Sequence, residues 1–248
     1  MTRRRWIADE VSGSRAALIG EHAEHLVRVL RARVGQDFDI ATGENVRRGR
    51  IISLNAGRVE FDLAEEIPFP SSIQLTLLLS IFKFDRMEWA IEKCTELGAA
   101  RIIPVIARRT DSHLAAASMK RVERWQRIAL QSAEQSRRSA PTEIDDPRKL
   151  ADALQVSAAL KIVLSESENQ TLLRDTVQRD VVQPDATDGE IFLAVGPEGG
   201  WTDDELQTFH QAGWTSASLG NTILRAETAA IAATAVVASM LQRGISSL

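Results

Sequence analysis

Residues 193–205 read LAVGPEGGWTDDE and join three structural signals in one short stretch. An apolar run over residues 190–195 is typical of a strand, and it breaks into GPEGG at residues 196–200. Thr202 and Glu205 have the T-x-x-E spacing of a capping box, which predicts that a helix begins there. Glycines beside a proline bend the backbone without Cβ atoms in the way, so a flat ligand can lie against the main chain. The stretch predicts a ligand loop between strand and helix; the alternative is an ordinary turn.

A second loop of similar character follows at residues 219–229, LGNTILRAETA. Two such loops in one chain favour a ligand site over two ordinary turns. Neither loop has the Walker spacing G-x-x-x-x-G-K-[ST] or the dinucleotide spacing G-x-G-x-x-G, and Glu198 would place a carboxylate beside any phosphate. The loops therefore suit a ligand without phosphate. S-adenosylmethionine is such a ligand, and backbone amides and carbonyls can read its adenine edge.

Together, GPEGG and LG-x-x-ILR-x-ETA resemble the closing signature of the bacterial 16S ribosomal RNA uridine-N3 methyltransferases, the small-subunit methyltransferase E family of the knotted SPOUT superfamily. The resemblance covers essentially the whole chain. It extends through upstream matches that would be weak singly: HLVRVLR at residues 25–31, EKCTELG at 92–98, RW at 124–125 and EQSRR at 134–138. One departure is Ala-Thr-Gly at residues 41–43, where the family pattern has an Asp-Gly turn, and it affects only that turn.

Two segments with different patterns divide the chain. Over residues 3–63, short β-like stretches alternate with turns around one helical stretch at residues 21–30, and such spacing predicts a small β-barrel. A linker follows at residues 65–72, where two prolines and paired serines fit a domain boundary. The resemblance implies that residues 1–68 form a PUA-like RNA-binding β-barrel. It also implies that residues 73–248 form a SPOUT methyltransferase domain with a C-terminal knot. The resemblance further implies a homodimer, formed by the knotted region.

Beyond the linker, strands alternate with helices, which is typical of an α/β domain with a mainly parallel sheet. The expected strands cover residues 73–81, 102–107, 160–164 and 191–195, and the expected helices cover residues 85–97, capped by Gly98, residues 119–137 and residues 226–241. The last helix is rich in alanine and threonine, whose small side chains permit close packing. The sequence leaves open whether that helix packs under the cofactor or across a dimer.

Charge is distributed unevenly along a chain whose net charge is −4. Residues 1–58 hold 11 Lys and Arg against 7 Asp and Glu, a net of +4; residues 83–141 hold 12 against 7, a net of +5; residues 142–248 hold 7 against 16. Two basic blocks and an acidic final third are expected when one surface meets a phosphate backbone. The alternative is that the basic residues lie on solvated helix faces.

The length and composition of the chain limit the classes of protein to which it can belong. With 248 residues, of which 44% are hydrophobic, the chain can fill one large core or two smaller ones. No apolar run reaches the roughly 18 residues of a membrane span, and the N-terminus lacks the apolar core of a signal peptide. We therefore expect a cytoplasmic protein without membrane contact. The single Cys94 excludes an intrachain disulfide and fits core packing better than a catalytic thiol, and the four histidines have no metal-ligand spacing, so no metal is expected.

Three roles have candidate residues. The catalytic candidates are Arg225, to stabilise negative charge on the uracil oxygens, and Glu198, as a base or a polar anchor; the alternative for Arg225 is a salt bridge with Glu227 or Glu198. Three loops are expected to hold the cofactor, the first of them only because the resemblance implies it, through Leu164, Ser165, Glu166, Gly196, Pro197, Glu198, Gly199, Gly200, Leu219, Gly220, Ile223, Leu224, Arg225 and Thr228. The RNA-binding candidates are Arg3, Arg4, Arg5, Arg28, Arg31, Arg109, Arg137 and Arg138.

The expected chemistry is direct displacement, in which a nucleophilic nitrogen attacks the methyl carbon of S-adenosylmethionine in line. Uridine N3 carries an imide proton, so a base must remove the proton or cations must stabilise the anion. N3 also lies on the Watson–Crick edge, so the target must be unpaired or extruded. Trp6, Trp201 and Phe84 are candidates for stacking on the base, with packing as the alternative.

The expected partner is 16S rRNA or the assembled small ribosomal subunit. Two other interpretations compete: a SPOUT methyltransferase that acts on another rRNA or tRNA nucleotide, and a noncatalytic RNA-binding assembly factor. The intact GPEGG and ILR-x-ETA loops argue against the last of these. The sequence does not give the nucleotide position, the form of the RNA substrate or the identity of the base.

Overall fold

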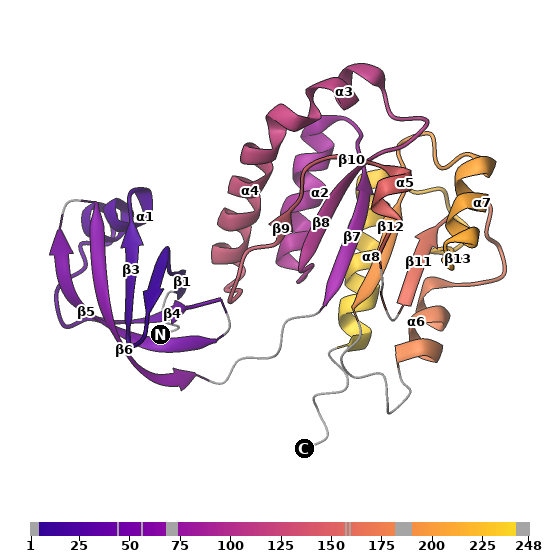
Figure 1. Ribbon diagram of the computed structural model, residues 1–248. Helices are drawn as coiled ribbons and strands as arrows, with labels where there is room; N and C mark the ends of the chain where they lie inside the picture. The colour runs from indigo at the N-terminus through magenta and orange to yellow at the C-terminus, as the bar shows by residue number, and fades with distance from the viewer. Residues whose placement is uncertain are drawn as a thin grey trace. The chain divides into compact units, whose positions relative to one another are not determined.

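The computed structural model describes residues 5–43, 45–55, 57–67, 74–156, 158, 160–181 and 190–241. The chain forms two compact units, one of Met1–Ser72 with Ala133–Pro141 and one of Ile73–Ser132 with Thr142–Leu248. Figure 1 traces both units by residue number. Arg3 and Arg4, two of the RNA-binding candidates, and most of the expected linker lie outside the described residues.

The first unit is built on a curled, mixed sheet with strand order β1-β4-β5-β6-β3-β2. Its strands are β1 (Arg5–Ile7), β2 (Glu10–Ser12), β3 (Arg15–Ile19), β4 (Asp37–Ala41), β5 (Val46–Asn55) and β6 (Arg58–Ile67). Only β1 and β4 pair in parallel; the other neighbours are antiparallel. The short β-like stretches expected from the sequence are therefore strands of one sheet.

A short helix and one apolar cluster complete the first unit. The predicted helical stretch is α1 (Glu21–Glu24), which continues as a π-helical turn, η1 (His25–Val29). It places Leu26 in a core with Trp6, Ile40 and Phe61, all buried. Gly49 on β5 is required by close approach, because a Cβ there would lie 2.4 Å from Cγ1 of Ile40. This core fixes the sheet, and buried Trp6 packs within it.

The turn after β4 forms despite the departure from the family pattern. Gly43 has a φ of 92°, a left-handed conformation that glycine adopts without strain. The Thr42 hydroxyl donates to Oδ1 of Asn45 at 2.6 Å, and the Thr42 amide donates to the Asn45 carbonyl at 2.9 Å. Threonine and glycine thus supply the turn that Asp-Gly was expected to make.

The second unit contains a parallel sheet with strand order β10-β8-β7-β12-β11-β13, and β9 pairs with β8 (Figure 1). The bounds are β7 (Leu75–Ser80), β8 (Arg101–Ile106), β9 (Glu143–Ile144), β10 (Arg148–Lys149), β11 (Leu160–Leu164), β12 (Ile191–Val195) and β13 (Thr215–Ala217). Each recorded pairing in this sheet is parallel. The prediction of an α/β domain with a mainly parallel sheet is confirmed.

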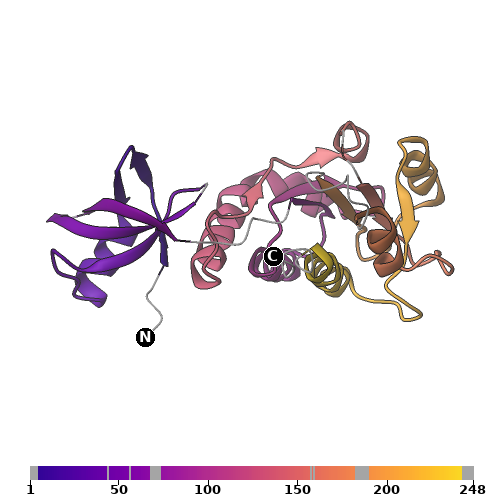
Figure 2. The ribbon, with the colours of Figure 1, turned by 90° about the horizontal axis from the view of Figure 1, so that it is seen from below.

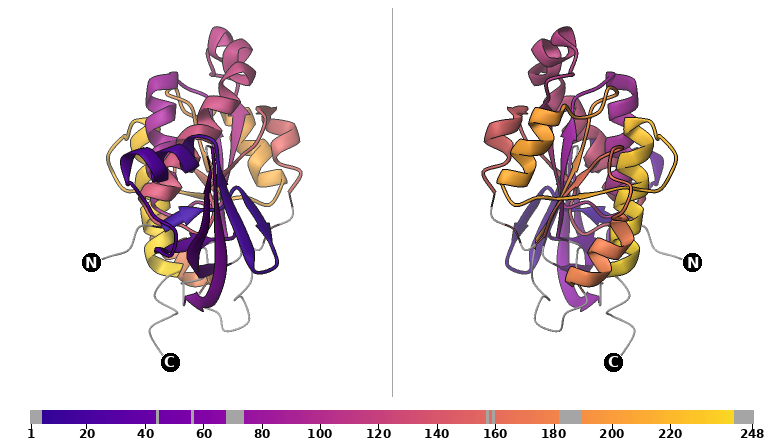
Figure 3. Two further views of the ribbon diagram at one scale, coloured as in Figure 1. Left: turned by 90° about the vertical axis from the view of Figure 1, so that its left-hand side faces the viewer. Right: turned by 90° about the vertical axis from the view of Figure 1, so that its right-hand side faces the viewer.

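Helices cover both faces of this sheet. One face packs against α2 (Phe84–Glu96), α4 (Val122–Gln135), α6 (Leu173–Val181) and α8 (Ala226–Leu241). The other packs against α5 (Leu150–Ala153) and α7 (Asp203–Gln211). Figure 2 shows α2 and α8 side by side, and the right-hand view of Figure 3 shows α7 and α8 on opposite sides of the sheet. Strands buried on both faces explain the continuous apolar runs in the sequence.

Two expected helix bounds differ from the structure. Residues 112–121 form α3 (Ser112–Ala117) and a 3-10 turn, η2 (Ser118–Arg121), so the helix expected over residues 119–137 begins at Val122. It ends at Gln135 because Arg137 adopts a left-handed φ of 60°. The Arg138 amide then donates back to the Ala133 carbonyl at 2.9 Å, as in a helix C-terminal cap.

Cys94 lies in the core, as predicted. Its side chain is fully buried on α2, and the Thr234 hydroxyl of α8 donates to its sulfur at 3.4 Å. Burial raises the pKa of the Cys94 thiol to about 12, so the thiolate is disfavoured. No helix among the described residues is long and apolar enough to span a membrane.

Candidate functional site

Three loops meet at the carboxyl edge of the parallel sheet. In the register, Leu164 at the end of β11 lies beside Ala217 at the end of β13, and Val163 lies beside Ala194 of β12. The segments that follow these strands, residues 164–167, 196–201 and 218–224, therefore leave the sheet together; we call them the loop edge. Ligands of open α/β sheets bind at such an edge.

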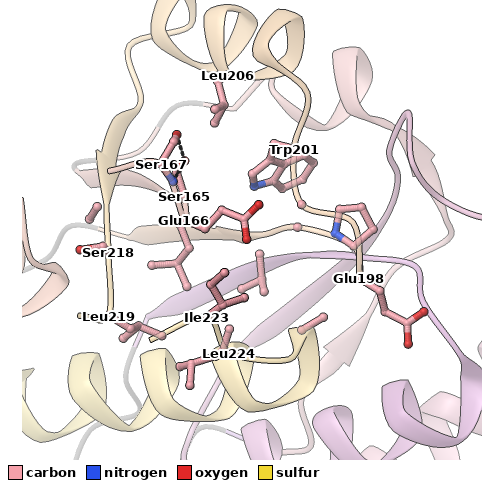
Figure 4. Close-up of a pocket in the computed structure, with 18 of the residues that line it drawn as sticks. Ser165, Glu166, Ser167, Glu198, Trp201, Leu206, Ser218, Leu219, Ile223 and Leu224 are labelled. Atoms are coloured by element: carbon pink, nitrogen blue, oxygen red, sulfur yellow. Dashed lines mark hydrogen bonds between the residues drawn. The ribbon is translucent and has the colours of Figure 1, made fainter. Parts of the chain in front are cut away.

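The loop edge encloses a cavity of about 310 Å³, shown in Figure 4. This volume falls at the lower end of the range for small-molecule sites. Among the predicted cofactor residues, eleven line the cavity: Leu164, Ser165, Glu166, Gly196, Pro197, Glu198, Gly200, Leu219, Gly220, Ile223 and Leu224. The structure thus brings all three predicted loops to one cavity, although their role in binding stays a prediction.

Other residues of the prediction lie elsewhere, and sequence reasoning missed several that line the cavity. Gly199, Arg225 and Thr228 do not line it. Eleven lining residues were not predicted to bind the cofactor, and five of them lie in β13, α7 and the first turns of α8: Arg109, Ser167, Val195, Trp201, Asp203, Leu206, Ala217, Ser218, Thr222, Ala226 and Ala229. Of these, Ala226 and Ala229 carried a signal, since packing under the cofactor was one of the two roles that the sequence left open for the alanine-rich helix.

The GPEGG segment, residues 196–200, which we call the glycine loop, is held by its own backbone and by one arginine. Gly200 has a φ of 69°, and its amide donates to the Pro197 carbonyl at 2.8 Å, which closes the turn. The Arg109 guanidinium donates to the Gly199 carbonyl and, at 3.3 Å, to the Trp201 carbonyl. A Cβ at Gly199 would lie 3.2 Å from Cδ of Arg109. Glycine at this position therefore makes room for the arginine that clamps the loop.

The predicted capping box forms at the start of α7. The Glu205 amide donates to the Thr202 hydroxyl at 3.3 Å, and the Thr202 amide donates to the Glu205 carboxylate at 2.9 Å. The same buried carboxylate accepts from the Arg108 amide at 2.7 Å. Glu205 therefore ties the start of α7 to the segment after β8, which fixes the end of the glycine loop.

Glu198 is ion-paired to a residue that the sequence did not single out. Arg86 on α2 donates to the Glu198 carboxylate at 2.8 Å, and its Nε lies 3.8 Å from the carboxylate of Glu227 on α8. Glu227 is 4% exposed, so Arg86 partly neutralises a buried charge. In Figure 4 the Glu198 carboxylate points away from the cavity. Arg86 thus links the glycine loop to the beginning of α8.

In the described part of the chain, Arg225 forms neither of the salt bridges considered for it, with Glu198 or with Glu227. Among the described residues, its side chain has no ion pair, and the partners proposed for it, Glu198 and Glu227, both lie against Arg86. Arg225 is exposed and precedes α8 directly. Its neighbour Ile223 is 84% exposed although it lines the cavity. The chain here places an exposed cation between two lining residues, Leu224 and Ala226, and close in sequence to the exposed apolar Ile223.

The cavity lining is acidic. Three acidic residues, Glu166, Glu198 and Asp203, are among those that line the cavity, with one basic residue, Arg109. The Arg109 guanidinium is engaged by backbone carbonyls, and Arg86 pairs with Glu198, so Glu166 and Asp203 leave a negative balance. Such a lining favours a ligand that carries positive charge.

The aromatic candidates for base stacking all pack against protein. Trp6 and Trp201 are buried, and Phe84 lies 6.0 Å from the Trp125 ring, with the Arg121 guanidinium 4.7 Å from its ring centroid. Trp201 stacks edge-on against Phe209 at 4.8 Å. Only Trp201 of these three lines the cavity.

The arginines of the first unit divide into engaged and exposed side chains. Arg47 on β5 donates to the carbonyls of Ala64 and Leu63, and Arg50 pairs with Asp37 at 2.9 Å. Arg28 and Arg31 are exposed; among the described residues Arg28 has a single ion pair, with Glu24 at 3.4 Å one helical turn away, and Arg31 has a left-handed φ of 51°.

Three further RNA-binding candidates lie together within this unit. Arg5 donates to the Arg137 carbonyl. Burial lowers the pKa of Arg138 to about 10, and burial is also the main cause that lowers the pKa of Arg5. The RNA contacts of these arginines stay predictions. Within the described ranges, no group of three or more His, Cys, Asp or Glu side chains is arranged to hold a metal ion.

Comparisons with known proteins identify the family of the chain. Residues 69–238 match the family model described as an RNA methyltransferase domain. The chain is 32% identical over 228 residues to the ribosomal RNA small subunit methyltransferase E of Rickettsia conorii, covering 90% of this chain and 89% of that protein. It is 30% identical over 242 residues to the Synechocystis protein of the same name, covering 94% and 76%.

Solved structures share the fold. A ribosomal RNA small subunit methyltransferase E from Neisseria gonorrhoeae, bound to S-adenosyl methionine, is similar with a TM-score of 0.80 and 30% identity, covering 96% of this chain and 98% of that one. A putative methyltransferase from Legionella pneumophila in complex with the same cofactor has a TM-score of 0.79 and 27% identity, covering 98% of each chain.

Proposed function

This chain belongs to the RNA methyltransferase family, within the ribosomal RNA small subunit methyltransferase E group, and from that premise we propose that it methylates a uridine at N3 in 16S rRNA. The methyl donor is S-adenosylmethionine. The observation that supports the proposal most is the cavity at the loop edge, where three loops predicted from the sequence meet. An rRNA substrate would place the protein in the cytoplasm.

The charge of the residues that line the cavity suits the proposed donor. S-adenosylmethionine has no phosphate, and the glycine loop offers backbone groups beside carboxylates rather than a phosphate cradle. The donor carries a positive sulfonium, which suits the negative balance of Glu166 and Asp203. When bound, it supplies a methyl group that is susceptible to nucleophilic attack.

Arg225 is the proposed cation for the uracil anion. The N3–H proton must leave before N3 can form its bond to the methyl carbon, and the resulting negative charge spreads over the uracil oxygens. Arg225 is exposed at the rim of the cavity and has no ion pair among the described residues, so its guanidinium can face the base. Preorganised cations of this kind lower the barrier to charge development.

Glu198 is proposed as a polar anchor of the site. Its carboxylate is occupied by Arg86 and points away from the cavity, which favours the anchor over the base among the two roles considered for it. The backbone of Pro197 and Gly200 would then meet the donor while the Glu198 side chain fixes the loop.

The remaining architecture is proposed from the same resemblance. We propose that the curled sheet of the first unit is a PUA-like RNA-binding barrel and that the loop edge contains the SPOUT knot. We also propose a homodimer. α8 supports it, since this helix is apolar around its circumference and residues such as Ile231, Val236 and Met240 are only partly buried.

Transfer of labelled methyl from S-adenosylmethionine to purified small ribosomal subunits and, separately, to naked 16S rRNA tests the proposal. Nucleoside mass spectrometry identifies the product, and N3-methyluridine is the expected result. A different methylated base would retain the donor but overturn the uridine-N3 assignment. Donor binding without transfer to either substrate would favour another RNA, and no donor binding would favour a noncatalytic RNA-binding factor.

A further inference from the structure

The indole N–H of Trp201 is a buried donor that faces the cavity. Trp201 is 7% exposed, and its Nε1 has no hydrogen-bond partner among the described residues. Figure 4 shows the indole nitrogen on the side of the ring that faces Glu166, within the group of side chains that line the cavity. A buried N–H without a partner destabilises the protein unless something else accepts from it.

Gly196 keeps side-chain atoms away from this buried donor. A Cβ at position 196 would lie 3.3 Å from Nε1 of Trp201, so any side chain there would crowd the N–H. The indole ring itself is fixed, because it packs edge-on against Phe209 with ring centroids 4.8 Å apart. Glycine at position 196 therefore avoids a close side-chain contact with the one polar atom of a fixed ring.

Trp214 provides a comparison, because it is a buried tryptophan that lies away from this cavity. It is 3% exposed, its Nε1 also lacks a partner, and it packs against the same Phe209 at 5.1 Å. Trp214 does not line the cavity. The two side chains share burial and aromatic contact, and of the two only Trp201 lines the cavity at the loop edge.

We propose that Nε1 of Trp201 donates a hydrogen bond to the nucleoside part of the bound methyl donor; the inference rests on the proposed function. The donor offers neutral acceptors on its adenine and ribose and a negative one on its methionine carboxylate. The carboxylates of Glu166 and Asp203 line the same cavity and disfavour a ligand carboxylate there. The neutral acceptors of the nucleoside therefore suit this position.

Calorimetry on the full chain tests the inference with Trp201→Phe, which removes the N–H and keeps an aromatic ring, and with Trp214→Phe as the matched control. Trp201→Phe is expected to raise the Kd of S-adenosylmethionine about 5- to 10-fold, as for loss of one hydrogen bond. The Kd of methylthioadenosine, which lacks the amino-acid carboxylate, should rise by the same factor. Trp214→Phe should leave both constants within about twofold.

An NMR measurement on the unmutated protein distinguishes a hydrogen bond to the donor from a change in packing caused by the substitution. The chain has five tryptophans, and the indole signal lost in Trp201→Phe assigns Trp201 in a ¹⁵N spectrum. On addition of S-adenosylmethionine this signal should shift and its proton should exchange more slowly with water, whereas the Trp214 signal should stay unchanged.

The outcomes separate the two proposals. If the wild-type protein does not bind S-adenosylmethionine, the proposed function fails and this inference falls with it. If the wild type binds and Trp201→Phe binds equally well, with an unmoved indole signal, only this inference is overturned. A loss confined to S-adenosylmethionine, with methylthioadenosine unaffected, would assign the hydrogen bond to the carboxylate and overturn the nucleoside assignment.

Discussion

The loop edge of the second unit and the arginine-rich sheet of the first unit hold their polar groups in different ways. At the loop edge the backbone defines the cavity, through glycines such as Gly200 with its left-handed φ and through the turn that its amide closes. On the first unit's sheet, long side chains define the surface, and several of them are already occupied. Arg47 binds backbone carbonyls and Arg58 pairs with Glu10 and Glu60.

The difference teaches which functional residues can be identified from sequence. A glycine at a positive φ or a close contact has few alternative explanations, so GPEGG indicates a shaped loop. An arginine has many, because five N–H donors can satisfy a carboxylate, a carbonyl or a phosphate equally well. Charge counts along the chain therefore indicate a basic surface without showing which arginines on it are available to RNA.

The largest effect is expected where a side chain, rather than the backbone, acts at the loop edge. Arg225→Ala should reduce the single-turnover rate of methyl transfer by about 100-fold or more, as for loss of a preorganised charge-stabilising donor. The melting temperature and the Kd of S-adenosylmethionine should change little, since Arg225 is exposed and does not line the cavity.

Arg174→Ala is the matched control, because Arg174 is exposed on α6 and pairs only with its neighbour Asp175 at 3.1 Å among the described residues. Activity of Arg225→Ala near that of Arg174→Ala would remove Arg225 from the mechanism.

Gly200→Ala tests the backbone half of the comparison. A Cβ at a φ of 69° is strained by about 1–2 kcal/mol, and it would also lie 3.1 Å from the Glu166 carboxylate. If the loop must keep this conformation to bind the donor, the Kd should rise about 5- to 30-fold. Gly213→Ala, at a φ of 77° outside the cavity, carries the same strain and should lower stability without changing donor affinity.

Arg86→Met tests whether a side chain also maintains the loop edge. The substitution removes the cation beside buried Glu227 and releases Glu198, so we expect a loss of about 1–2 kcal/mol in stability and weaker donor binding. Arg86→Lys should restore part of both. In a double-mutant cycle with Glu198→Gln, the effects on donor Kd should be less than additive. Additive effects would mean that Arg86 does not act through Glu198.

The exposed arginines of the first unit should matter for RNA and the engaged ones for folding. Arg28→Ala with Arg31→Ala is expected to weaken binding of small-subunit rRNA several-fold and to lower the slope of log K against log salt by about 0.7 per lost phosphate contact. Arg47→Ala should lower the melting temperature and leave that slope unchanged, because its guanidinium is used by backbone carbonyls. The reverse pattern would contradict the division between these side chains.

Much of the fold could be predicted because local signals agree with it. Apolar runs predicted β11 and β12, and the T-x-x-E spacing predicted the start of α7. The short strands β9, β10 and β13 were missed, since two or three residues have no periodicity and exist only by pairing with neighbours. The placement of β12 between β7 and β11 is likewise a long-range property that no local pattern contains.

The site was predictable where it depends on glycine, and not where it depends on side-chain direction. Arg86 lies among other charged residues of α2 and gives no signal in the sequence, although it links the glycine loop to α8. Trp201 was considered for stacking or packing, but the free N–H at the cavity depends on the rotamer of the ring and on its contact with Phe209. Such features require the folded structure.

The smallest expected effect distinguishes shape from charge at the loop edge itself. Glu166 lines the cavity without an ion pair among the described residues, so its carboxylate should favour the cationic donor over the product S-adenosylhomocysteine, which lacks the sulfonium charge. Glu166→Gln should raise the Kd of S-adenosylmethionine about three- to fivefold and leave that of the product nearly unchanged, as expected for one solvent-accessible charge pair. Equal weakening of both ligands would show that Glu166 contributes shape alone, and that other groups at this edge distinguish the donor from its product.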